Sequence, residues 1–96
     1  MSRVLTVGFE FQDIFYYSLI RVKELAGETE YQITIMNEKL QTVLSGNDIL
    51  KEKDGHLKIQ IPESGNLQDL KIKVAEALST LLDMPLEKEL MLDKFY

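Results

Sequence analysis

The chain has 96 residues, 45% of them apolar and 28% charged, which is the size and composition of one folded domain and unlike a disordered chain. It contains no cysteine, which excludes disulfides, thiolate metal sites and a cysteine nucleophile. The 16 acidic and 11 basic residues give a formal charge of −5, which repels nucleic acid and anionic membrane surfaces. We therefore expect a single domain over residues 1–96, with neither nucleic acid nor a membrane as its partner.

The beginning of the chain carries no targeting pattern. Met1 to Arg3 run directly into a strand-like stretch, without a basic region followed by an apolar one. Nowhere does the sequence approach the ~20 apolar residues of a membrane span. These features predict a cytoplasmic location.

The first third of the sequence has the alternating pattern of β-strands. From Val4 to Phe11 the odd positions are apolar, which predicts a half-buried strand. Gln12-Asp13 predicts a turn. Ile14 to Leu25 is rich in β-branched and aromatic residues and predicts a second strand. After a turn at Ala26-Gly27-Glu28, Thr29 to Met36 predicts a third.

The pairing of the second and third predicted strands decides which side chains share a face. A hairpin loop with an even number of residues places two apolar sets together on the core side. These sets are Ile20 and Val22, and Tyr31, Ile33 and Ile35. The same parity places Arg21 and Lys23 near Glu30 and Gln32 on the opposite face. It also places four large side chains on that opposite face, namely Phe15, Tyr17, Leu19 and Met36.

The stretch from Asn37 to Gly46 is ambiguous. Leu40, Val43 and Leu44 lie at helical spacing, and Asn37 is a suitable N-cap, which favours a helical turn or two. The alternative is a strand from Leu40 to Leu44 that continues the meander.

Asp48 to Ile61 carries the clearest hairpin signal, because Asp54-Gly55 separates two apolar-containing arms. A two-residue loop pairs Leu50 with Ile59, whereas a three-residue loop with a bulge pairs Ile49 with Ile59.

Asn66 to Leu82 predicts one amphipathic helix, with Asn66 as N-cap. Its apolar face comprises Leu67, Leu70, Val74, Ala77, Leu78 and Leu81. After Pro85, the spacing of Leu86, Leu90 and Met91 predicts a short second helix. The expected fold is therefore α+β: a two-layer sandwich in which an antiparallel, meander-like sheet of about five strands is covered on one face by the C-terminal helix.

The residues that could carry chemistry are few. His56 is the only histidine and follows the predicted Asp54-Gly55 turn, where a solvated role is expected. Asp48, Glu52 and Asp54 lack the spacing of a calcium loop, and the glycines form no phosphate-binding run. Lys51, Lys53 and Lys58 are interleaved with acidic residues and predict a mixed-charge surface. We therefore expect no enzyme activity, no cofactor and no metal site.

The apolar side chains on the outer side of the sheet allow two interpretations. Either the chain covers Phe15, Tyr17, Leu19 and Met36 with its own C-terminal segment or with the Leu40 to Leu44 piece, or these residues form an interaction surface. The second interpretation predicts a non-enzymatic interaction or adaptor module whose partner is another protein or a second copy of the chain. The alternative function is a carrier that holds a small apolar ligand between sheet and helix.

Overall fold

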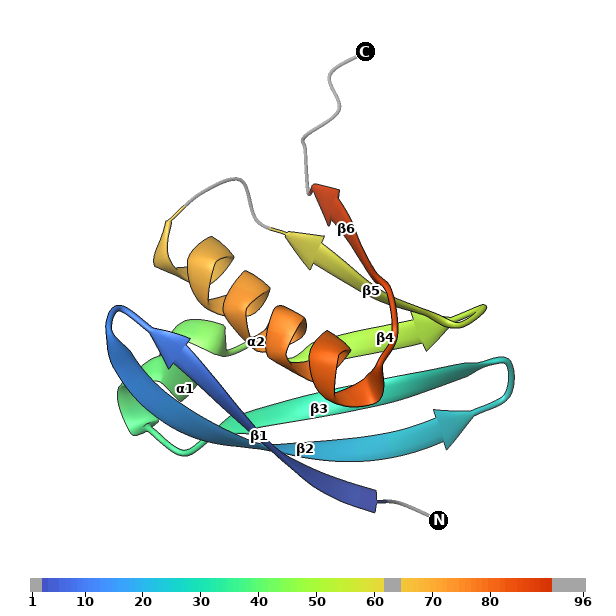
Figure 1. Ribbon diagram of the computed structural model, residues 1–96, viewed down its shortest axis with the longest axis horizontal. Coiled ribbons are helices and arrows are strands. Elements are labelled where there is room, and N and C mark those ends of the chain that lie inside the picture. Colours follow the sequence, from blue (N-terminus) through green and yellow to red (C-terminus); the bar gives the residue numbers. More distant parts are fainter. Residues whose placement is uncertain (1–2, 62–64, 91–96) are drawn as a thin grey trace.

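The computed structural model describes residues 3–61 and 65–90, which form a six-stranded sheet and two helices (Figure 1). The strands lie in the sheet in sequence order: β1 (Arg3–Phe11), β2 (Ile14–Leu25), β3 (Glu28–Ile35), β4 (Ile49–Lys53), β5 (His56–Ile61) and β6 (Leu86–Leu90). Adjacent strands are antiparallel except β5 and β6, which are parallel. The predicted α+β class and meander-like sheet are confirmed, with six strands among the described residues where about five were expected.

Two of the hairpins close through two-residue turns in the left-handed conformation. Gln12 and Asp13 have φ angles of 51° and 66°, and Asp54 and Gly55 have φ angles of 55° and 79°. Positive φ at both central positions matches the twist of the flanking strands. Lys51 lies opposite Lys58, which is the register of the predicted two-residue loop. The alternative with a bulge is therefore wrong.

One face of the sheet carries the core. Ile20 lies opposite Ile33 and Val22 opposite Tyr31, so the predicted sharing of a face by β2 and β3 is confirmed. The buried apolar residues of the strands are Val7, Phe9, Phe11, Ile20, Val22, Tyr31, Ile33, Ile35, Leu50, Leu57, Ile59 and Ile61. We call this side the inner face and the opposite side the outer face.

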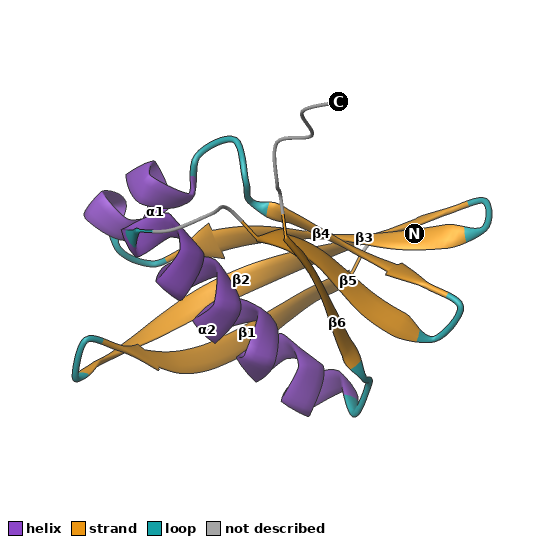
Figure 2. Ribbon diagram, turned by 90° about the horizontal axis from the view of Figure 1, so that it is seen from above, coloured by secondary structure: helices purple, strands orange, loops and turns teal. Residues whose placement is uncertain are grey.

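Helix α2 (Asn66–Leu82) lies across the inner face (Figure 2). Its predicted apolar stripe is confirmed at Leu70, Val74 and Leu78, which are fully buried. Leu81 was expected in the same stripe but is exposed, because Leu82, four residues after Leu78, packs against the core in its place. Asn66 is also not the N-cap, since the helix begins there and is preceded by a Gly65 cap with positive φ.

Helix α1 (Glu38–Leu44) confirms the helical interpretation of this stretch, and the alternative strand from Leu40 to Leu44 is wrong. The Asn37 side chain accepts a hydrogen bond from the Leu40 amide at 3.1 Å, as expected for an N-cap. The Leu44 side chain is buried in the core beneath the inner face.

The predicted second C-terminal helix is wrong, because residues 86–90 form β6. Asp83 ends α2 in the left-handed conformation, and the Pro85 carbonyl accepts a hydrogen bond from the Leu57 amide at 2.8 Å. This contact places Leu86 opposite Leu57 and aligns the strand parallel to β5. The edge of β5 supplies backbone partners, whereas so short a segment cannot sustain a helix alone. Met91, the third residue of that prediction, lies outside the described residues.

Candidate functional site

Both helices lie on the inner side of the sheet, so neither covers its outer face (Figure 2). The four predicted interaction residues are all exposed there: Phe15 58%, Tyr17 57%, Leu19 38% and Met36 61%. We call these four residues the outer apolar patch. The interpretation that the Leu40 to Leu44 piece covers them is wrong, because α1 packs against α2 and β3 with Leu44 in the core. The last residues of the C-terminal segment lie outside the described part of the chain.

The outer apolar patch is continuous. The rings of Phe15 and Tyr17 meet edge to face, with centroids 5.1 Å apart. Leu19 follows on the same face of β2, and the Met36 amide donates to the Tyr17 carbonyl at 2.8 Å, which places Met36 beside Tyr17. The patch is therefore one surface and not four separate side chains.

Gly8 supports the position of the Phe15 ring. This glycine lies in β1, and the Phe15 ring approaches it closely. A Cβ atom built on Gly8 would lie 2.9 Å from Phe15 Cε2 and collide with the ring tip. A glycine opposite Tyr17 thus allows the Phe15 ring to lie down on β1.

A depression adjoins the patch along the same strands. It has a volume of about 330 Å³ and is lined by Val4, Leu19, Arg21, Gln32 and Thr34. Arg21 lies opposite Gln32 in the β2–β3 pairing, as predicted. The outer face of β1 to β3 therefore offers exposed aromatic rings at one end and a partly polar hollow at the other.

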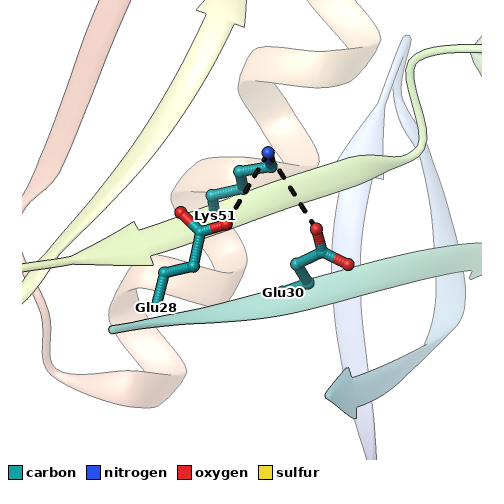
Figure 3. Close-up of polar contacts among 3 residues, drawn as sticks. All are labelled: Glu28, Glu30 and Lys51. Carbon is teal, nitrogen blue, oxygen red and sulfur yellow. Dashed lines mark ion pairs between the residues drawn. The ribbon is translucent and has the colours of Figure 1, made fainter. Parts of the chain in front are cut away.

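Charged residues of both signs form a row across the outer face. Lys23 lies opposite Glu30, Glu30 opposite Lys51, and Lys51 opposite Lys58. The Lys51 Nζ atom lies 3.8 Å from Glu28 Oε1 and 3.9 Å from Glu30 Oε2 (Figure 3). The mixed-charge surface predicted around Lys51 is present, and the two glutamates offset the charge of this lysine.

Strands β4 and β5 diverge beyond their hairpin. Their pairing extends only from Lys53 opposite His56 to Lys51 opposite Lys58. Beyond that point β4 follows β3, while β5 pairs with β6 (Figure 1). A cavity of about 260 Å³ lies at this divergence. Its charged lining comprises Lys51, Lys53, Lys58, Lys71, Glu28 and Glu89.

Lys71 also lines this cavity, although the sequence analysis did not identify it as a candidate site residue. It belongs to α2 and is 4% exposed, yet no hydrogen bond or ion pair with it is found among the described residues. Burial lowers the pKa of its amine, and the nearby Asp48 carboxylate opposes that shift only in part. The charged row and the helix thus contribute cations to one hollow.

The other titratable residues named from the sequence are dispersed. Glu52 accepts a hydrogen bond from the Tyr31 hydroxyl at 2.7 Å, and Asp54 lies in the β4–β5 turn. His56 is exposed, with Nδ1 at 3.9 Å from Glu87 Oε2. Over residues 3–61 and 65–90, no three histidine, aspartate or glutamate side chains are grouped to hold a metal ion.

Neither a protein-family model, nor a curated protein sequence, nor a solved structure matches this chain. Of the two helices that the structure describes, neither has the length and apolar character needed to cross a membrane. The surface features described above are therefore the basis for assigning a function.

Proposed function

We propose that this protein is a non-enzymatic interaction module and that the outer apolar patch pairs with a second copy of the chain. The observation that carries the proposal is the continuous exposure of large apolar side chains on a sheet face that neither helix covers. Water penalises exposed apolar surface at roughly 25 cal/mol per Å², and a protein partner removes that penalty.

The shape of the outer face supports a second copy as the partner. A two-fold axis pairs each surface with itself, so a self-complementary surface is required. Here the exposed Phe15 and Tyr17 rings lie at one end of β2, and the depression that contains Arg21 lies further along it. An antiparallel pairing seats the rings of one copy in the hollow of the other. It also brings Tyr17 near an arginine, a favourable cation–π arrangement.

The charges beside the patch support the same pairing. Lys23, Glu30 and Lys51 alternate in sign across neighbouring strands. Such a row can face its own copy with lysines opposite glutamates, and it forms the polar rim that surrounds an apolar interface core. The net charge of −5 opposes association only at long range, where salt screens it.

The alternative function, a carrier of a small apolar ligand, gains no support from the inner face. Leu70, Val74 and Leu78 of α2 are fully buried against Ile20 and Ile33 of the sheet. Most of the residues that line the cavity at the divergence of β4 and β5 are lysines and glutamates, which do not suit an apolar ligand.

The test is the mass of the protein in solution, measured by sedimentation over a range of concentrations. We expect the unmodified chain to form a dimer. The double variant Tyr17→Ser/Leu19→Lys should be monomeric and should still unfold in one cooperative thermal transition. Leu81→Lys is the matched control, because Leu81 is an exposed leucine on α2, away from the outer face. This control should remain dimeric.

Two results would contradict the proposal. One is a monomeric unmodified chain at every concentration. The other is unfolding of the double variant, which would show that Tyr17 and Leu19 are needed by the fold itself.

A further inference from the structure

The cavity between β4 and β5 combines several cations in a chain whose net charge is negative. Lys53 and Lys58 approach it from the outer face, and no ion pair with either is found within the described ranges. Lys51 also lines it, with Glu28 and Glu30 offsetting its charge. Lysines of like charge repel one another unless an anion lies between them. Their convergence on one hollow therefore indicates a ligand of negative charge.

Lys71 is the second, independent observation. A buried ammonium group is unfavourable unless it is paired, and buried polar groups in proteins have partners as a rule. The Lys71 side chain is 96% buried, yet no described residue donates to, accepts from or forms an ion pair with it. The Asp48 carboxylate is near enough to raise the pKa of Lys71, but it lies beyond ion-pair distance from the Lys71 amine. An anion in the cavity supplies the partner that the protein does not.

We propose that this cavity binds the phosphate group of a small molecule, with Lys71 at its floor and Lys58 and Lys53 at its outer side. Lysine ammonium groups act as compact point charges and are frequent phosphate ligands. The two charges of a phosphate dianion offset those of Lys53 and Lys58, for which no ion pair is found among the described residues, and Lys71 donates to one of its oxygens.

The remainder of the lining suits an organic phosphate. Ile49 and Ile59 provide an apolar wall, while Gln60 and Glu89 provide acceptors for hydroxyl groups. At about 260 Å³, the cavity is larger than a free phosphate ion requires. This site is distinct from the outer apolar patch and does not depend on the proposed dimer.

The probes are inorganic phosphate and glycerol phosphate, with sodium chloride at equal ionic strength as the reference. We expect phosphate to raise the melting temperature of the unmodified chain, because a ligand that binds only the folded state stabilises it. The ³¹P resonance of the probe should shift or broaden. Tighter binding of glycerol phosphate would identify an ester as the ligand, and tighter binding of inorganic phosphate would identify the free ion.

Lys71→Met is the decisive variant, because methionine matches the lysine side chain as far as Cε and lacks only its ammonium group. We expect it to weaken phosphate binding by about tenfold or more, as the loss of a charge-assisted hydrogen bond does. Lys73→Met is the matched control, since Lys73 is an exposed lysine on the same helix. This control should bind phosphate as the unmodified chain does.

Lys58→Met serves as a second variant should Lys71→Met fail to fold, and it should weaken binding in the same direction. The proposal is overturned if phosphate and chloride raise the melting temperature equally, or if the control and Lys71→Met respond alike. Phosphate-induced amide shifts confined to residues away from β4, β5 and α2 would also overturn it.

Discussion

At the scale of single residues, Tyr31 is the buried phenol of the core, 2% exposed. Its hydroxyl donates to Glu52 Oε1 at 2.7 Å, which joins β3 to β4 by a side-chain bond as well as by the ladder. Burial and the neighbouring Glu52 carboxylate both raise the pKa of Tyr31, because each disfavours a phenolate. The folded state therefore holds this proton more tightly than the unfolded state does.

We expect Tyr31→Phe to lower the free energy of unfolding by about 1 kcal/mol at neutral pH, the usual net value of such a hydrogen bond. The pKa of Tyr31 in the folded state lies above its ordinary value of 10.0. Its contribution is thus complete below pH 10 and declines as the pH rises above 10. Chemical denaturation of both chains at pH 7 and above pH 10 should show their difference shrinking. A difference that grows with pH would contradict this account.

Lys71 shows why one part of the candidate site escapes sequence analysis. On a helix, a lysine beside an apolar stripe normally extends into water. Lys71 is buried because it lies under the point where β4 and β5 diverge. The two strands diverge there because β5 pairs with β6. A contact between elements this distant in the sequence leaves no local pattern. The outer apolar patch was predictable, by contrast, because period-two alternation fixes the face of each residue once the hairpin parity is known.

At the scale of elements, α2 provides a comparison of two leucines on one helix. Leu78 is fully buried, whereas Leu81 is 53% exposed in the last turn. We expect Leu78→Ala to cost ~2–5 kcal/mol, as large-to-small changes in a core do. Leu81→Ala should stay within about 0.5 kcal/mol of the unmodified chain. Urea unfolding of the two variants tests this, and equal losses would mean that the helix packs on a different face.

The elements themselves were largely predictable, for identifiable reasons. Alternation and the Asp54-Gly55 turn specified β1 to β5, and three- and four-residue spacing specified α2. The segment at Leu86 was predicted as a helix because its leucines are four residues apart. Five residues carry too little periodicity to distinguish a helix from a strand, and the deciding factor was the unpaired edge of β5.

At the scale of the whole molecule, the inner face depends on α2 for its cover. We expect a chain truncated after Gly65 to lose cooperative folding, because its inner face would lie in water. The residues left uncovered are Val7, Phe9, Ile20, Val22, Ile33, Ile35 and Ile59. Calorimetry would detect the loss as the absence of a heat-absorption peak, and a cooperative transition in this chain would contradict the architecture.

The matched comparison is a chain truncated after Pro85, which keeps α2 and removes β6 together with the residues that follow it. It retains the hydrogen bond from the Leu57 amide to the Pro85 carbonyl. We expect it to unfold cooperatively at a lower temperature than the complete chain. Together the two truncations distinguish the stability that α2 provides by covering the core from the stability that β6 provides by pairing with β5.

The order of the strands has a consequence for how the protein is made. Because β1 to β5 each pair with a sequence neighbour, the contacts within the meander are local in the sequence, which favours fast folding. Helix α2, which covers the inner face of the meander, is synthesised later, since the ribosome must add about 20 residues after Ile61 before α2 is complete. At ~5–20 residues per second, synthesis leaves the apolar inner face open for roughly one to four seconds. During that interval the nascent meander is a natural target for chaperones.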